Sequence, residues 1–126
     1  MYKNTITLLL LFLAISSYAG TYRCTPETQS IFGKNNKDFI DTAKPYSIIE
    51  DEREPMLHRC SYVASRNGNV CDAYKVDKVE IDKFVNIKKF YVFRSQFDIQ
   101  LFSELSYVEN NGRGGILFGK CELVKP

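Results

Sequence analysis

The sequence predicts an all-β domain, a small antiparallel β-barrel or sandwich of about seven to nine short strands stapled by two disulfide bonds. Beyond residue 19, the chain holds 30 Val, Ile, Phe and Tyr residues, which favour strands, against 8 Ala and Leu, which favour helices. Short apolar segments recur about every ten residues between turn-forming residues. Four cysteines in so short a chain complete the pattern.

The N-terminal segment has the organisation of a secretory signal peptide. Lys3 precedes an apolar run from Ile6 to Ile15, and Ser17-Tyr18-Ala19 forms a small-x-small cleavage site. The run is too short to span a bilayer, because a spanning helix needs about 20 residues. We therefore predict a signal peptide over residues 1–19 and a single exported domain over residues 20–126.

The cysteines read as a disulfide framework, because an even number in a short exported chain favours oxidation over metal binding. They are Cys24, Cys60, Cys71 and Cys121. Four cysteines allow three pairings, and the sequence does not choose among them. We favour Cys24 with Cys121, which would join the first strand to the last, and Cys60 with Cys71, which would staple a hairpin. The second bond needs a hairpin loop longer than two residues.

The residues before the first cysteine argue against a lipid anchor. A lipoprotein carries small residues directly before its first cysteine, whereas Thr21-Tyr22-Arg23 precedes Cys24. We therefore expect a soluble periplasmic or secreted protein rather than a lipoprotein.

In the first half of the domain, the sequence predicts a strand over Thr21–Cys24, followed by a polar segment, residues 25–44. Within that segment one helical turn fits Asp38–Ala43, because Pro45 stops it. Tyr46–Ile49 reads as a strand, and the acidic Glu50–Pro55 reads as a loop. Asn67-Gly68 predicts a hairpin, because both residues tolerate positive φ. The strands expected on either side of it are Leu57–Ala64 and Asn69–Val76.

The second half repeats short strands with alternating or continuous apolar residues. Gly119, inside the last of them, predicts a bulge or a bend. Asn110–Gly115, between the last two strands, reads as a loop because it contains three glycines. The expected strands are Val79–Asp82, Ile87–Phe93, Phe97–Leu101, Leu105–Glu109 and Ile116–Val124.

Composition narrows the class of function. The net charge of +2 falls to +1 when Lys3 leaves with the signal peptide, and the lysines are interleaved with acids, so we expect no nucleic-acid partner. His58 is the only histidine, and no Gly-x-Ser-x-Gly motif is present. We therefore predict no catalytic residues, no cofactor and no metal site, and the sequence favours a non-enzyme.

Two segments are candidates for contact with a partner. The acidic side chains near residue 50 could attract a cationic partner, although such a run is also typical of a solvated loop. Arg113 is the one long side chain in the glycine loop and could pair with a carboxylate, although a plain turn would look the same. The candidate partner-binding residues are Glu50, Asp51, Glu52, Glu54, Asn111 and Arg113.

Both ends of the domain resemble the small exported lysozyme inhibitors of bacteria, through Tyr22-Arg23-Cys24 and Gly119-Lys120-Cys121-Glu122-Leu123. Phe90-Tyr91-Val92-Phe93, followed by Arg94-Ser95, is similar to that family's strand before its Lys-Gly motif. The Lys-Gly motif itself and the family's inhibitory Ser-Gly-x-x-Tyr stretch have no clean equivalent. The resemblance implies a compact β-barrel, and it leaves the inhibitory residues unassigned.

We therefore expect an exported protein-binding module, an inhibitor or immunity-type binder of a cell-wall or other secreted hydrolase. Its partner would be a cationic exported enzyme such as a lysozyme, which carries a carboxylate-lined cleft. The alternative is a structural or accessory envelope protein without an enzyme target.

Overall fold

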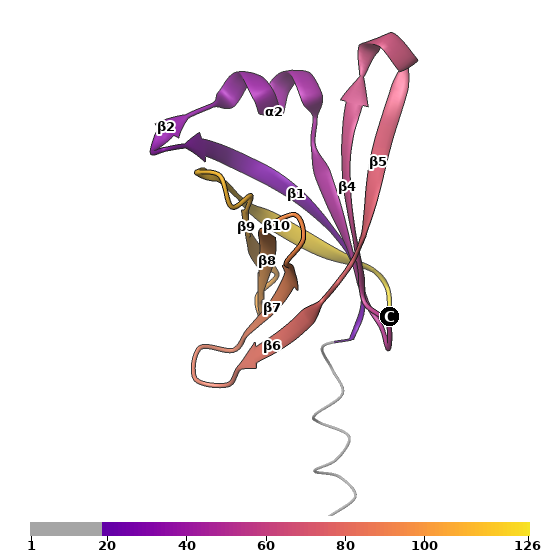
Figure 1. Ribbon diagram of the computed structural model, residues 1–126, viewed down its shortest axis with the longest axis vertical. Helices are drawn as coiled ribbons and strands as arrows, with labels where there is room; N and C mark the ends of the chain where they lie inside the picture. Colours follow the sequence, from indigo (N-terminus) through magenta and orange to yellow (C-terminus); the bar gives the residue numbers. More distant parts are fainter. Residues whose placement is uncertain (1–18) are drawn as a thin grey trace, which may run out of the picture.

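The computed structural model describes residues 19–126, in which ten antiparallel strands form one rolled sheet with a short helix across one end (Figure 1). Residues 1–18 of the predicted signal peptide lie outside the described residues. The elements in chain order are β1 (Gly20–Ile31), β2 (Lys34–Asn35), α2 (Lys37–Ala43), β3 (Tyr46–Asp51), β4 (Met56–Val63), the 3-10 turn η1 (Ala64–Arg66), β5 (Gly68–Lys75), β6 (Lys78–Asp82), β7 (Ile87–Val92), β8 (Phe97–Phe102), β9 (Ser106–Asn110) and β10 (Gly115–Lys125).

The strands are hydrogen-bonded in the order β5-β4-β3-β1-β10-β9-β8-β7-β6, and β2 pairs with the far end of β1. The edge strands β5 and β6 are not hydrogen-bonded to each other, so the sheet is open along one seam. Val76 and Asp77 cross between the two edges: the Val76 N–H donates to the Pro55 carbonyl and the Asp77 N–H to the Tyr91 carbonyl. The fold is therefore one sheet rolled toward a barrel, without the second sheet that a sandwich requires.

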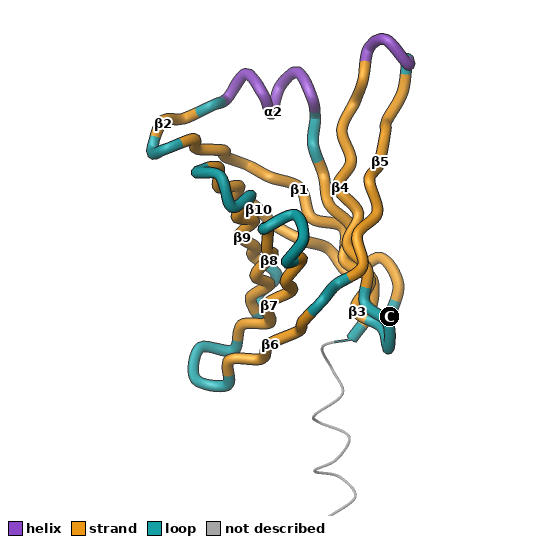
Figure 2. Tube along the Cα trace, in the orientation of Figure 1, coloured by secondary structure: helices purple, strands orange, loops and turns teal. Residues whose placement is uncertain are grey.

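Because the strands are antiparallel, the loops gather at two opposite ends of the rolled sheet (Figure 2). One end carries α2, the β4–β5 turn, the β7–β8 turn and the β9–β10 loop, and we call it the α2 end. The opposite end carries the β3–β4, β6–β7 and β8–β9 turns.

The all-β prediction is confirmed, and all nine expected strands form; the two-residue β2 is the tenth. The expected end of the first strand at Cys24 is wrong, because β1 continues to Ile31. Pro26 does not end the strand, since a register shift follows it and proline is tolerated at bulges. This irregularity lies opposite Gly119, where an added Cβ would stand 2.1 Å from the Thr25 carbonyl oxygen.

Both favoured disulfides are confirmed. Cys24–Cys121 joins β1 to β10, and Cys60–Cys71 joins β4 to β5. The β4–β5 hairpin has the longer loop that the second bond requires, since η1 and Asn67, at φ 50°, separate the last strand pair. The register of this hairpin places Cys60 directly opposite Cys71.

The interior of the rolled sheet divides into two halves. Away from α2 it is filled mainly by apolar side chains, among them Tyr22, Ile49, Leu57, Phe90 and Leu101, each 3% exposed or less. Toward α2 the inward-facing side chains include polar ones beside the apolar Phe97 and Leu117, and they leave a cavity. The half toward α2 contains the candidate functional site.

Candidate functional site

A cavity of about 190 Å³ lies inside the α2 end of the rolled sheet. Its wall includes Ser47 on β3, Arg59 on β4, Tyr74 on β5, and Tyr107 and Glu109 on β9. Strand alternation explains the selection, because side chains two residues apart on one strand face the same side of a sheet. Tyr107 and Glu109 are such a pair, and both are buried.

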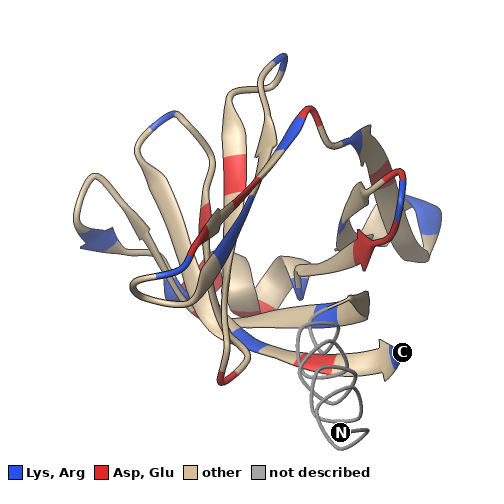
Figure 3. Cartoon of the chain, turned by 90° about the horizontal axis from the view of Figure 1, so that it is seen from below, with Lys and Arg blue, Asp and Glu red and all other residues tan. Residues whose placement is uncertain are grey.

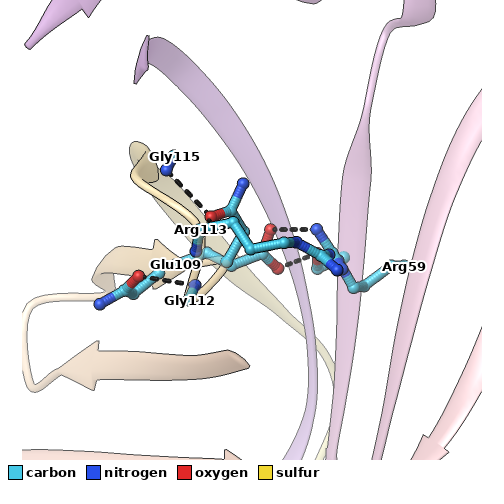
Figure 4. A network of polar contacts seen from close by, with 8 residues as sticks. Arg59, Glu109, Gly112, Arg113 and Gly115 are labelled. Atoms are coloured by element: carbon cyan, nitrogen blue, oxygen red, sulfur yellow. Dashed lines mark hydrogen bonds and ion pairs between the residues drawn. The ribbon is translucent and has the colours of Figure 1, made fainter. Parts of the chain in front are cut away.

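An ion pair joins β4 to β9 inside the rolled sheet at this level, between the buried Glu109 and Arg59, whose side chain is 29% exposed (Figure 4). Arg59 Nη2 lies 3.5 Å from Glu109 Oε2, and the Ser47 hydroxyl donates to Glu109 Oε1 at 3.1 Å. The Arg59 guanidinium also stacks over the Phe97 ring, 4.7 Å from its centroid. These contacts join β4 and β3 to β8 and β9, strands that are far apart in the sheet order.

Burial is the main cause of the pKa shifts of the titratable side chains in this wall. Glu109 is 2% exposed, and loss of water around its carboxylate raises its pKa above the ordinary value, although Arg59 and Ser47 pull the pKa down. Burial, reinforced by the Glu109 charge, also raises the pKa of Tyr107. Within residues 19–126, the buried Tyr107 hydroxyl has no hydrogen-bond partner. The wall therefore holds hydrogen-bonding capacity that the described side chains do not satisfy.

The glycine loop between β9 and β10 stands at the rim of the cavity. Asn111 Oδ1 accepts hydrogen bonds from the backbone N–H of Arg113 at 2.7 Å and of Gly115 at 2.9 Å, and Asn110 Oδ1 accepts one from Gly112 at 2.9 Å (Figure 4). Asn111 and Gly115 also line the cavity. The asparagine side chains thus hold the loop that presents Arg113, which is exposed.

Neighbouring turns hold the same loop from both sides. Gly112, at φ 74°, lies against the β7–β8 turn, where an added Cβ would stand 1.9 Å from the Gln96 carbonyl oxygen. Gly114, at φ 87°, lies beneath the ring of Phe32, whose backbone N–H donates to the Gly114 carbonyl at 2.8 Å. Glycine is needed at both positions, because these φ values and close approaches disfavour a side chain.

The acidic candidates are placed differently from the expectation of one acidic loop. Glu50 and Asp51 belong to β3, which extends two residues beyond the expected strand. Glu50 contacts His58 Nε2 at 2.7 Å, and the buried Asp51 pairs with Lys88 inside the sheet. Both carboxylates are thus engaged within the chain.

Glu52 and Glu54 are exposed in the β3–β4 turn, at the end opposite Arg113. The structure therefore does not bring the acidic candidates and the glycine loop onto one surface. Viewed from that end, lysines and arginines are interspersed with acidic residues around the sheet (Figure 3). Asn111 and Arg113 remain together in the β9–β10 loop, where the Asn111 side chain accepts a hydrogen bond from the Arg113 backbone N–H.

The sequence did not single out Arg59, Tyr107 or Glu109. The alternation of β9 could have paired Tyr107 with Glu109 on one face. Nothing local marks that face as the inner one, and Arg59 lies on a strand 50 residues earlier in the chain. The pairing therefore depends on how the sheet rolls.

The chain matches no protein-family model, no curated protein and no solved structure. Within residues 19–126, no three His, Cys, Asp or Glu side chains are grouped to hold a metal ion. Among the same residues, no helix has the length and apolar character needed to cross a membrane. The candidate site therefore consists of the cavity and its rim loop.

Proposed function

We propose that the protein is an exported binding module that inhibits or neutralises a secreted hydrolase by inserting its β9–β10 loop into an acidic cleft. The single observation that carries the proposal is the presentation of Arg113 on a loop whose backbone N–H groups donate three hydrogen bonds to asparagine side-chain oxygens. Binding through an already ordered loop loses little conformational entropy. A lysozyme-type enzyme, with its carboxylate-lined cleft, is the target class we propose.

The chemistry of the rim supports this use. Arginine presents a planar fork that can pair with a carboxylate through two hydrogen bonds. Phe32, which packs on the same loop through Gly114, is 81% exposed. Arginine and aromatic side chains are enriched among the residues that dominate binding energies in protein interfaces. An exposed Phe32 beside an exposed Arg113 therefore supplies an apolar and a charged anchor on one rim.

The remaining candidate residues take narrower roles in this proposal. Asn111 shapes the loop rather than contacting the partner, because its side-chain oxygen is occupied by the loop backbone. Glu52 and Glu54, at the opposite end, contribute only through the long-range field that steers a cationic enzyme. Glu50 and Asp51 are engaged by His58 and Lys88 and are left out of the contact.

The test is inhibition of a c-type lysozyme by the purified domain, residues 20–126, in molar excess. We expect dose-dependent inhibition, which Arg113→Ala weakens by about 30-fold, the effect typical of a residue that dominates an interface. The matched control is Arg53→Ala, which removes the same charge from an exposed turn at the opposite end. Unchanged lysozyme rates at saturating domain concentrations would contradict the proposed target class.

A second measurement tests the identity of the target enzyme separately from the role of the β9–β10 loop. A pull-down with the same domain from an extract that contains secreted hydrolases should retain one stoichiometric enzyme partner. If that partner binds wild type and the Arg113→Ala variant equally, the loop is an ordinary turn and the proposed contact is wrong.

A further inference from the structure

The cavity inside the α2 end has no role in the proposed protein–protein contact, and what it binds can be inferred independently of that contact. It is lined by residues of β1, β3, β4, β5, β9 and β10 and by Phe39 of α2, and it is open to solvent on one side. Small-molecule sites occur preferentially in the mouths of barrel-like sheets, where a few polar groups converge inside a shaped hollow. The hollow here contains such groups.

The charge of the wall favours a neutral ligand. Arg59 and Glu109 pair directly with each other in the cavity wall, so a cation would also meet the guanidinium and an anion would also meet the carboxylate. Asp72 is the third charged residue of the lining, and it lies on the exposed edge strand β5, where water screens it. An ion entering the cavity would lose its hydration without gaining an unpaired counter-charge.

The hydrogen-bonding groups of the wall favour a ligand that both donates and accepts. A guanidinium carries five donors, and within residues 19–126 the ion-pair contact of Arg59 is with Glu109 alone. The Glu109 carboxylate accepts from Ser47 and retains further acceptor positions. The buried Tyr107 hydroxyl, unpartnered among the same residues, can do either. A hydroxyl group on a ligand matches all three, because it donates and accepts at once.

Size and shape restrict the ligand further. An engineered cavity of about 150 Å³ accommodates one benzene ring, so a hollow of about 190 Å³ accommodates one six-membered ring with its substituents. Tyr74, which packs edge-on against Phe97 at 4.9 Å, lines the same space and offers an aromatic surface to the C–H groups of such a ring.

We propose that this cavity binds a single neutral sugar ring, with hydroxyl groups that hydrogen-bond to Arg59, Glu109 and Tyr107. The ring is either a free monosaccharide or the terminal unit of a glycan, since both present the same hydroxyls. Free hexoses and their methyl glycosides distinguish these sources, because a methyl glycoside imitates the end of a chain.

The experiment is a titration of the isotope-labelled domain, residues 20–126, followed by amide chemical shifts. The probes are glucose, galactose, N-acetylglucosamine and their methyl glycosides, each up to about 50 mM, which saturates a site with a millimolar Kd. Glucosamine and glucuronate are matched probes, because they place an ammonium or a carboxylate on the same ring. We expect saturable shifts around the cavity for at least one neutral sugar, and at least tenfold weaker binding of both charged analogues.

Tyr107→Phe is the informative variant, because it removes only the unpartnered hydroxyl and keeps the ring that fills the core. It should fold at least as stably as wild type and bind the sugar about three- to tenfold more weakly, the contribution of one hydrogen bond between uncharged groups. Tyr62→Phe, on the exposed part of β4, is the matched control and should bind as wild type does. Glu109→Gln, which keeps the shape but removes the charge, should also weaken binding.

Three outcomes would overturn the assignment. The first is the absence of saturable shifts with every neutral sugar. The second is tighter binding of glucosamine or glucuronate than of the neutral ring, which would identify an ion site. The third is wild-type affinity in the Tyr107→Phe variant, which would place the sugar elsewhere. None of these outcomes bears on lysozyme inhibition by the Arg113 loop.

Discussion

The two disulfides should differ in how much they stabilise the domain. Cys24–Cys121 closes a loop with a sequence separation of 97, whereas Cys60–Cys71 closes one of 11. A cross-link stabilises mainly by restricting the unfolded chain, and the effect grows with loop length. The two perturbations compared are the double variants Cys24→Ala/Cys121→Ala and Cys60→Ala/Cys71→Ala.

The loop lengths set the expected magnitudes. The chain-entropy relation gives about 4.7 kcal/mol for Cys24–Cys121 and about 2.8 kcal/mol for Cys60–Cys71. Burial should increase the difference between the two losses of unfolding free energy, because Cys24 and Cys121 are both buried whereas Cys71 is exposed. A domain of this size has a free energy of unfolding of about 5–15 kcal/mol, so loss of the longer loop removes a third or more of it.

Urea unfolding followed by far-ultraviolet circular dichroism measures the difference. With a denaturant slope of about 2 kcal/mol per molar, the two midpoints should differ by about 1 M. Dithiothreitol provides a control on wild type: alkylation and mass spectrometry should find Cys60–Cys71 reduced first, because Cys71 is exposed. Equal midpoints, or a lower midpoint for Cys60→Ala/Cys71→Ala, would refute the loop-length reasoning. Free thiols in the purified wild-type protein would refute the two disulfide bonds themselves.

The remaining predictions concern buried charge and backbone strain. Burial raises the pKa of Glu109 in the folded protein. The stability that this raised pKa contributes is fully present below the unfolded pKa of about 4.3 and is lost as pH rises through the folded pKa. The free energy of unfolding of wild type should therefore increase relative to that of Glu109→Gln as pH falls toward 4. Gly112→Ala should lower the free energy of unfolding by more than about 2 kcal/mol, because φ is 74° and the added Cβ would meet a backbone carbonyl. Gly33→Ala should lower it by only about 1–2 kcal/mol, because φ is 80° but the added Cβ would meet no other atom. Lys88→Met removes the charged partner of the buried Asp51 carboxylate and should lower the free energy of unfolding by about 3–5 kcal/mol. Adding Asp51→Leu in the same chain should restore most of that loss.

Each of these predictions has an opposing result. A stability difference between wild type and Glu109→Gln that does not change between pH 4 and 7 would mean that the carboxyl is not perturbed by burial. Equal midpoints for Gly112→Ala and Gly33→Ala would show that the contact with the β7–β8 turn is unimportant. A Lys88→Met variant as stable as wild type would mean that Asp51 finds another partner.

Local sequence patterns predicted the elements well. The hairpin at Asn67-Gly68, the helical turn before Pro45 and the irregularity opposite Gly119 all form. In the hairpin only Asn67 takes a positive φ, because Gly68 is already paired in β5. The main local error was the early end assigned to the first strand. The polar residues after Cys24 gave no sign of a strand, but β1 continues through them, and a bulge accommodates Pro26 opposite Gly119.

The site was predicted less well than the fold. The acidic residues were grouped because they adjoin in sequence, yet alternate side chains of a strand face opposite ways. Asp51 therefore points inward to Lys88, while Glu50 points to His58. Arg113 remains exposed as the loop composition predicted, because glycine and asparagine residues organise the chain around it.

The sequence by itself determined the strand-forming composition, the positions of the turns and the number of cysteines available for cross-links. The composition and the cysteines are read directly from the sequence, and the turns follow from backbone preferences that act over a few residues. Only the tertiary structure decided which face of each strand is inner, that the sheet stays open between β5 and β6, and that Arg59 pairs with Glu109 in the wall of a cavity. Those outcomes depend on sheet twist and register summed over all the strands, and these bring together residues that no local pattern relates.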